Sequence, residues 1–254
     1  QLWVNDGQGN YTEEAAERGL VFFEQSWTAD FADVDNDGDF DCLVTNHSTT
    51  LFLLENDGTG QFTNITEGSG LEVTGFFLQA KMEDFDNDGY VDLVYSGGVH
   101  AYFHNNGDQT FTQLPNTFPY GDTMHSFATG DVNRDGQVDL YASYGDGYVN
   151  ADNGNDDVLW LNEGNADQHW ITFELEGFQS NRDAVGATVE ITGSFGTQVR
   201  SVRAGESYGI TSTFSCHFGL GAVDVVETAT VFWPSGLTTE LTAPAVDQYH
   251  TILE

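Results

Sequence analysis

Short apolar runs separated by turn-forming residues dominate the first two thirds of the chain. Runs such as residues 42–45, 51–54 and 92–95 are rich in Val, Leu and Tyr, which favours strands. Asn-Asp-Gly and Asn-Asn-Gly between such runs predict hairpin turns, because Asn and Gly tolerate a positive φ. Helical periodicity is confined to residues 13–18, where we expect a turn or two of helix. The pattern predicts an all-β chain.

Two motifs repeat along this region. An acidic nonapeptide occurs three times, beginning at Asp33, Asp84 and Asp131. An apolar pair followed by an Asn-x-Gly turn occurs at residues 2–7, 53–58, 102–107 and 159–164. Four short strands in a repeat of about 50 residues are typical of propeller blades. We therefore predict a partial β-propeller of about 3.5 blades over residues 1–166.

The repeat ends near Gly164, and longer alternating strands follow it. They are predicted at residues 170–175, 187–192, 197–204, 229–233 and 238–241. Alternation of apolar and polar residues is typical of strands with one buried face. The sequence thus predicts a second domain, a β-sandwich-like domain over residues 167–254.

Each acidic nonapeptide has the form of a chelating loop, D-x-D-x-D-G-x-x-D. Side chains at its first, third and fifth positions face a common centre, and glycine at the sixth allows a sharp turn. The seventh position offers a carbonyl, and the ninth adds a carboxylate. Such an all-oxygen set suits Ca²⁺. The predicted ligands of about three Ca²⁺ ions are Asp33, Asp35, Asp37, Asp39, Asp41, Asp84, Asp86, Asp88, Tyr90, Asp92, Asp131, Asn133, Asp135, Gln137 and Asp139.

The three loops are not equivalent, and they are not EF-hands. The first, with Asp39 as an additional acid, is expected to bind most tightly, and the third, with Asn133, most weakly. An EF-hand needs Glu at the twelfth position and flanking helices. Here the twelfth positions are Val44, Tyr95 and Ala142, and the flanks are predicted strands. The alternative, acidic surface turns without an ion, is weakened by three copies in register.

Charge narrows the choice of partners. The chain has 6 Lys and Arg against 41 Asp and Glu, a formal net charge of −35, which argues against nucleic acid or an anionic membrane as a partner. No apolar stretch is long enough to span a bilayer. Three bound Ca²⁺ would neutralise only a small part of this charge. Most of the acidity is therefore expected on a solvated surface, as in a protein adapted to high salt.

The sequence also makes predictions about individual cysteine, tryptophan, histidine and asparagine side chains. Cys42 and Cys216 are expected to be two buried thiols rather than a disulfide, because each follows a strand pattern in a different region. Trp3 and Trp160 occupy equivalent repeat positions, which predicts packing between blades. His217 is interpreted as a structural hydrogen-bonding residue, and the other histidines as surface or strand residues. Sequons at residues 10–12, 46–48 and 64–66 permit N-glycosylation, and chance matches to the sequon are the equal alternative.

The acidic loops with their following strands resemble FG-GAP/VCBS repeats. The tail resembles the ASPIC/UnbV domain through four motifs in order: residues 180–187, Arg203-Ala204-Gly205, residues 217–221 and Trp233-Pro234-Ser235-Gly236. Together they are similar to the cartilage acidic protein family. This resemblance implies a secreted or cell-surface, calcium-binding propeller that acts in extracellular interaction rather than in catalysis.

We therefore expect a recognition or adhesion module for an extracellular protein or glycan. The alternative is a calcium-dependent polysaccharide lyase or hydrolase on a propeller scaffold. A closed propeller has about four to eight blades, more than this chain supplies. The sequence therefore predicts either a fragment of a longer protein or a subunit completed by self-association or by blades from another chain.

Overall fold

The structure is a computed structural model that describes residues 1–47, 50–118, 123–145, 154–165, 167–206 and 209–254. These residues form twenty strands and no helix, which confirms the all-β prediction. Residues 13–18, expected to form a turn or two of helix, form a single turn and no regular helix. Glu13 ends β2 (Tyr11–Glu13), and the Arg18 amide donates to the Glu14 carbonyl at 3.0 Å in an isolated turn. So short a segment cannot offset the cost of helix nucleation.

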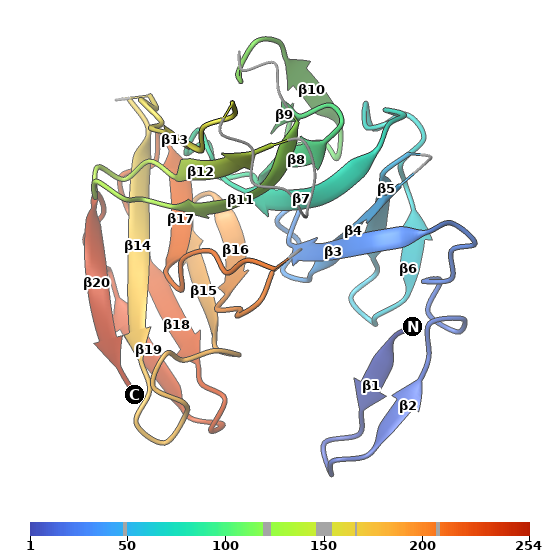
Figure 1. The fold of residues 1–254 in the computed structure, drawn as a ribbon. Coiled ribbons are helices and arrows are strands. Elements are labelled where there is room, and N and C mark those ends of the chain that lie inside the picture. The colour runs from blue at the N-terminus through green and yellow to red at the C-terminus, as the bar shows by residue number, and fades with distance from the viewer. Residues whose placement is uncertain (48–49, 119–122, 146–153, 166, 207–208) are drawn as a thin grey trace.

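The first two thirds of the chain form blades of consecutive antiparallel strands (Figure 1). The first blade comprises β3 (Ser26–Ala32), β4 (Asp41–Asn46), β5 (Phe52–Asn56) and β6 (Phe62–Asn64). The second comprises β7 (Phe77–Glu83), β8 (Asp92–Gly97), β9 (Ala101–Asn105) and β10 (Phe111–Leu114). The third comprises β11 (Met124–Gly130), β12 (Asp139–Tyr144) and β13 (Val158–Trp160). A two-stranded hairpin of β1 (Trp3–Asn5) and β2 precedes them as half a blade.

The blades pack face to face around their first strands. β3 contacts β7, and β7 contacts β11. One apolar cluster, between the first and second blades, includes Leu53, Phe77 and Phe103. A second cluster, between the second and third blades, includes Phe127 and Leu140. Because each inner sheet is covered on both faces, β4 and β8 are buried along their whole length. None of the described sheets closes into a ring, so the blades form the predicted partial propeller.

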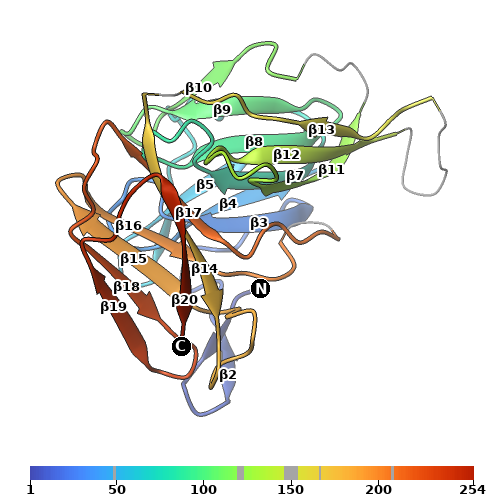
Figure 2. The ribbon, with the colours of Figure 1, turned by 90° about the vertical axis from the view of Figure 1, so that its left-hand side faces the viewer.

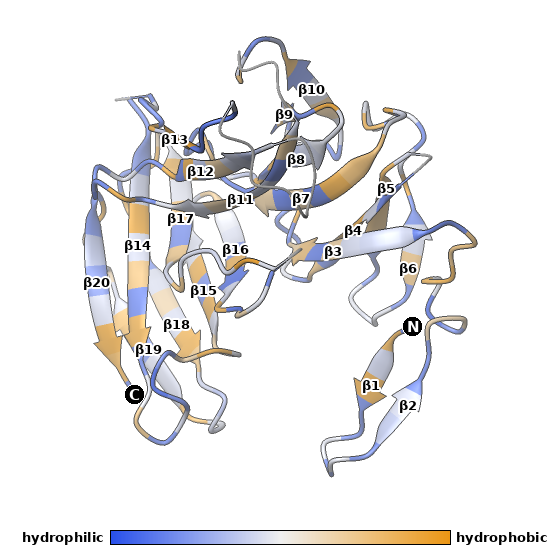
Figure 3. Ribbon diagram, viewed as in Figure 1, coloured by the Kyte–Doolittle hydropathy of each residue, from blue (hydrophilic) through white to orange (hydrophobic). Residues whose placement is uncertain are grey.

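The last third of the chain is a β-sandwich, as predicted (Figure 2). Its strands are β14 (His169–Glu176), β15 (Thr188–Gly193), β16 (Gly196–Ser201), β17 (Cys216–Gly221), β18 (Thr228–Phe232), β19 (Thr238–Thr242) and β20 (Gln248–Leu253). One sheet has the order β17-β14-β20, with β14 and β20 parallel, and the other has the order β16-β15-β18-β19. Apolar and polar residues alternate along β14 (Figure 3), whose apolar face joins the core between the sheets.

The sequence missed β17 and β20, because glycines interrupt the first and polar residues dominate the second. The domain boundary between residues 166 and 167 stays a prediction. Both cysteines are free and buried, as expected, and burial raises the pKa of each thiol to about 12. The described residues contain no helix that is long and apolar enough to cross a membrane.

The packing expected for Trp3 is wrong, and one of the three sequons is a chance match. Trp3 is 57% exposed, because β1 pairs only with β2 among the described residues. Its counterpart Trp160 is half-buried against Phe118 and donates to the Tyr144 hydroxyl at 3.3 Å. Asn46 is fully buried at the end of β4, and its amide bonds the Thr50 carbonyl, so this sequon is not accessible to glycosylation. Ser48 of the same sequon lies outside the described residues.

Candidate metal centres

Each acidic nonapeptide connects the first two strands of a blade. We call residues 33–41, 84–92 and 131–139 the first, second and third acidic loops. The three loops share one backbone conformation. The fourth position has a left-handed φ of 61° at Asn36, 62° at Asn87 and 61° at Arg134, and the sixth has 98° at Gly38, 102° at Gly89 and 87° at Gly136. The sixth-position conformation favours glycine, as the sequence predicted.

Side chains within each loop turn inward by the same hydrogen bonds. The third-position oxygen accepts the amide of the fifth residue: 3.2 Å at Asp35, 3.2 Å at Asp86 and 3.1 Å at Asn133. The fifth-position oxygen accepts the amide of the seventh residue: 3.1 Å at Asp37, 2.9 Å at Asp88 and 3.0 Å at Asp135. These local bonds fix the loop and gather oxygen atoms on its inner side.

The ninth-position aspartates Asp41, Asp92 and Asp139 tie each loop to the third strand of its blade. One carboxylate oxygen accepts the amide of the second loop position, at 3.0, 3.2 and 2.9 Å respectively. The other accepts the amide of the hairpin Asn, at 2.8, 2.9 and 2.8 Å. A carboxylate oxygen has a second lone pair. These hydrogen bonds therefore give the aspartates a structural role and leave them able to bind a metal ion. Their role as metal ligands stays a prediction.

The first and second loops bring three carboxylates together. Ligand atoms of Asp33, Asp35 and Asp37 lie within 4.8 Å of one another, and so do those of Asp84, Asp86 and Asp88. The third loop has only two acids at these positions, and the Asn133 amide donates to Asp135 Oδ2 at 2.8 Å. This internal bond occupies an oxygen that a cation would use. It supports the expectation that the third loop binds most weakly.

Burial makes these carboxylates unfavourable as free anions. Desolvation, with neighbouring carboxylates adding to it, raises the pKa of Asp33 to about 6 and that of Asp92 to about 8. The pKa of Asp84 is raised well above its usual value by the same causes. Asp84 is 1% exposed, and its Oδ1 has no hydrogen-bond partner among the described residues. A divalent cation would satisfy this oxygen and remove the charge repulsion, so the residues present fit Ca²⁺.

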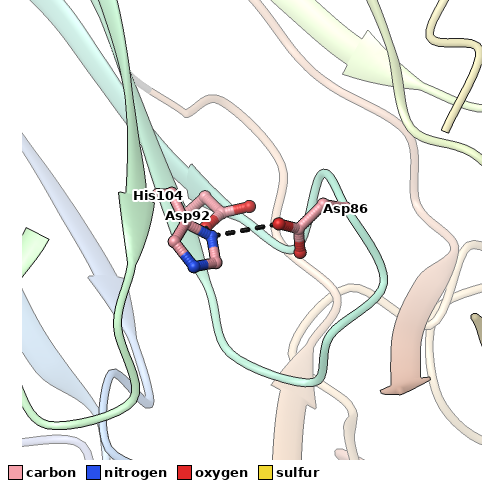
Figure 4. Close-up of side chains that lie close together, drawn as sticks. All are labelled: Asp86, Asp92 and His104. Carbon is pink, nitrogen blue, oxygen red and sulfur yellow. Dashed lines mark ion pairs between the residues drawn. The ribbon is translucent and has the colours of Figure 1, made fainter. Parts of the chain in front are cut away.

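His104, on β9, is a site residue that sequence reasoning missed. Its Nδ1 lies 3.0 Å from Asp86 Oδ2 and 3.4 Å from Asp92 Oδ1, so the imidazole faces the second loop (Figure 4). His104 immediately precedes the hairpin Asn, as Glu55 does in the first blade and Leu161 in the third. Aligning the repeats at this Asn would have placed these side chains beside the loops.

The loops are linked to one another through their fourth positions. The Asn36 amide donates to the Gly89 carbonyl of the next loop at 3.1 Å, and the Asn87 amide donates to the Gly136 carbonyl at 2.8 Å. In the third loop this position is Arg134, which pairs instead with Glu174 of β14 at 2.7 Å. The chain of loops therefore continues into the C-terminal domain.

The C-terminal domain covers the second acidic loop with β17. His217 is buried, its Nε2 lies 2.6 Å from Asn87 Oδ1, and its Nδ1 lies 2.8 Å from the Thr172 hydroxyl. The Gly219 amide donates to Asp84 Oδ2 at 3.1 Å. A Cβ on Gly219 would lie 2.2 Å from that oxygen, so only glycine allows this approach. The predicted structural role of His217 is confirmed.

The same domain contacts the third acidic loop through two aromatic side chains. Trp170 lies against Gly136, where an added Cβ would come within 2.0 Å of the indole. The Tyr249 hydroxyl donates to Asp131 Oδ2 at 2.7 Å, and the Arg134 guanidinium lies 3.8 Å from the centre of the Tyr249 ring. The domain therefore docks on the second and third loops.

Comparison with known proteins agrees with this division of the chain. A family model described as an FG-GAP-like repeat matches residues 33–95 and 84–142. A model described as ASPIC and UnbV matches residues 177–254. A search of curated proteins found no match for the chain. The repeat matches include all three acidic loops completely, and the domain match includes β17.

Proposed function

We propose that this chain, which joins FG-GAP-like repeats to an ASPIC/UnbV domain, is a calcium-stabilised recognition module of the extracellular type. One observation carries the proposal: Asp84 is buried in a ring of carboxylates with an unpartnered oxygen. An acidic cluster of this kind is costly to bury unless a cation occupies it. FG-GAP-like repeats are typical of extracellular proteins, where free Ca²⁺ is abundant enough for weak sites.

Calcium in this proposal has a structural role. About three ions would be held by the first, third and fifth side chains of the loops, by the seventh carbonyl and by the ninth carboxylate. Each ion would neutralise its loop and fix the turn between the first two strands of a blade. Since the C-terminal domain rests on the second and third loops, the ions would also stabilise the contact between the two domains.

A cavity beside the second acidic loop is the candidate recognition site. It has a volume of about 600 Å³ between the second and third blades and is lined by Tyr102, Phe118 and Trp160, with Asn162 and Gln168 at its polar side. Aromatic faces combined with a few amide groups suit a glycan segment. An extracellular protein is the other partner class. The open edge of β1 supports addition of a strand from another chain.

Chelation tests the calcium role. For dissociation constants on the order of 10⁻⁴ to 10⁻³ M, about 10 mM Ca²⁺ would stabilise the fold by about 1.4 to 2.7 kcal/mol per site. Removing the ions with EGTA should therefore lower the melting temperature by about 10 °C or more. Added Ca²⁺ should restore it, and the same concentration of Mg²⁺ should not. An unchanged melting temperature would refute the calcium role.

A glycan array tests the recognition site, with Trp160→Ala as the probe. The exposed Trp3 occupies the equivalent repeat position, so Trp3→Ala is the matched control. We expect Trp160→Ala to abolish glycan retention and Trp3→Ala to leave it unchanged. Equal retention by both variants would contradict the cavity assignment. A shortened glycan after incubation would indicate the polysaccharide-active alternative.

A further inference from the structure

The connection between β16 and β17 extends from the C-terminal domain towards the blades (Figure 1). We call its residues 203–206 and 210–213 the inner hairpin, because they meet the first strands of the blades. Glu206 pairs with Ile210 in an antiparallel bridge, which joins the two halves of the hairpin. None of these residues belongs to an acidic loop. The inner hairpin is therefore a second structured element through which the C-terminal domain contacts the blades.

The inner hairpin contacts the first strand of each blade. In the first blade, the Arg203 guanidinium pairs with Asp30 of β3 at 2.9 Å. In the second blade, the Lys81 ammonium of β7 pairs with Glu206 at 2.7 Å. In the third blade, two hydrogen bonds join the hairpin to the backbone of Thr129 on β11. Three successive first strands thus share one partner.

The contact with the third blade covers a backbone edge of β11. The Thr129 amide donates to the Ser212 hydroxyl at 3.2 Å, and the Thr129 carbonyl accepts the Thr213 amide at 3.0 Å. A Cβ on Gly130 would lie 3.2 Å from the Thr213 side chain, so the hairpin approaches the strand closely. An uncovered strand edge offers unpaired backbone groups to other chains. The inner hairpin satisfies both backbone groups of Thr129.

The few basic residues of the chain are concentrated where the two domains meet. Six Lys and Arg stand against 41 Asp and Glu. Lys81, Arg134 and Arg203 each form an ion pair with an acid of the other domain. Arg18 and Arg182 pair within their own domain. Because the pairs run in both directions across the junction, they fix how the C-terminal domain sits on the blades.

The pair of Lys81 and Glu206 is shielded from water. Their side chains are 6% and 9% exposed. Burial alone would lower the pKa of Lys81, but the carboxylates of Asp30 and Glu83 raise it above its usual value, so the lysine stays charged. A buried charge that loses its partner is strongly destabilising, whereas an exposed pair contributes little. The fit of the inner hairpin to β7 therefore has a large energetic weight.

We propose that the inner hairpin closes the inner side of the partial propeller, by holding together the first strands of all three blades. In a complete propeller, closure of the ring keeps the blades in place. Here one element of the C-terminal domain connects β3, β7 and β11 instead. The C-terminal domain is then part of the stability of the blades themselves. This role uses contacts outside the acidic loops and does not depend on calcium.

Hydrogen exchange of the full chain tests this role, with Ca²⁺ saturating so that the acidic loops are in the same state throughout. The probe variant is Lys81→Met, which removes the charge that pairs with Glu206. The reporter is the Thr129 amide, because the inner hairpin binds it in a different blade from Lys81. We expect its exchange to accelerate at least about tenfold, since the loss of one partner of a buried pair is strongly destabilising.

Two controls separate release of the inner hairpin from a general loss of stability. Arg182→Met removes the same charge from a pair with Glu176, whose side chains are 82% and 49% exposed, and it should leave the exchange of the Thr129 amide unchanged. Amides of β9 lie in the same blade as Lys81 but on its third strand. They should keep their protection in Lys81→Met.

The double variant Lys81→Met/Glu206→Gln removes the unpaired acid together with the lysine. It should therefore recover most of the protection of the Thr129 amide. An unchanged Thr129 amide in Lys81→Met, or equal acceleration at Thr129 and in β9, would overturn the inference. Circular dichroism shows whether each protein is folded. If Lys81→Met does not fold, recovery of the fold in the double variant supports the inference, and failure of both variants contradicts it.

Discussion

The first and second acidic loops have nearly the same sequence but lie in different surroundings. In the first loop Asp37 and Gly38 are exposed, and a Cβ on Gly38 would meet no atom within 4 Å. In the second loop the corresponding Asp88 is half-buried and Gly89 is buried, with Gln198 and Gly219 of the C-terminal domain against it. The hydrogen bonds of the third and fifth positions are the same in both loops, but Asp33 Oδ1 accepts the Asp37 amide at 3.1 Å whereas Asp84 Oδ1 has no partner among the described residues. The difference in burial comes from the neighbours.

This comparison separates two roles of one motif. The nonapeptide by itself builds an oxygen-lined turn, and the first loop presents that turn to solvent. In the second and third loops the same turn is also a docking surface, because its sixth glycine admits the C-terminal domain. A covered carboxylate is more desolvated, which accounts for the strongly raised pKa of Asp84. Three measurements test this difference between the loops.

The largest expected effect is the pH dependence of the metal-free protein. Burial raises the pKa of Asp41 to about 7 and of Asp92 to about 8, so the folded chain binds protons more tightly than the unfolded chain. This stabilisation is complete below the unfolded pKa of about 4 and is lost as the pH rises through about 7 to 8. The melting temperature in EGTA should therefore fall by several degrees between about pH 6 and pH 9.

Two matched variants test which acidic loop causes this pH dependence. Asp84→Asn and Asp33→Asn each remove the first carboxylate of a loop. Because Asp84 is the more desolvated, Asp84→Asn should flatten the pH profile more than Asp33→Asn does. His217, whose pKa burial lowers to about 4, raises stability as the pH rises from about 4 to about 6.5, so its contribution lies mainly below this range and has the opposite sign. A melting temperature that rises with pH, or equal slopes for the two variants, would contradict the comparison.

A smaller effect is expected from alanine at the sixth position. Gly38→Ala and Gly136→Ala impose similar backbone strain, about 1 to 2 kcal/mol, because both residues have positive φ. Only Gly136→Ala also collides with Trp170, which adds about 1 to 3 kcal/mol of overpacking. Urea unfolding in saturating Ca²⁺ should show the difference. Equal destabilisation by the two variants would mean that the domain contact at Trp170 contributes little.

The smallest effect is expected from two tyrosine hydroxyls. Tyr102 and Tyr249 each donate to a loop carboxylate at 2.7 Å, Tyr102 to Asp92 in the second loop and Tyr249 to Asp131 in the third. Tyr102→Phe should cost about 1 to 3 kcal/mol, because it leaves a buried carboxyl oxygen with one donor fewer. Tyr249 is more exposed, so Tyr249→Phe should cost about 1 kcal/mol. Thermal unfolding checks the order, and a reversed order would be inconsistent with burial of the second loop.

The sequence predicted those features that depend on neighbouring residues. The blade repeat, the hairpin turns and the acidic loops follow from turn chemistry and strand alternation within a few residues, and the structure contains them where expected. The expectation for Trp3 failed because its exposure depends on a strand outside the hairpin. The sequence left open whether the Asn46 sequon is accessible, because the burial of Asn46 depends on packing of the whole blade.

By itself, the sequence determined that three oxygen-lined turns would form between short strands, because Asp, Asn and Gly at fixed spacings direct the backbone locally. Only the tertiary structure decided which turns the C-terminal domain would cover. Such contacts join residues far apart in the chain. They depend on how the blades stack and on where the C-terminal domain docks, and no local pattern encodes either.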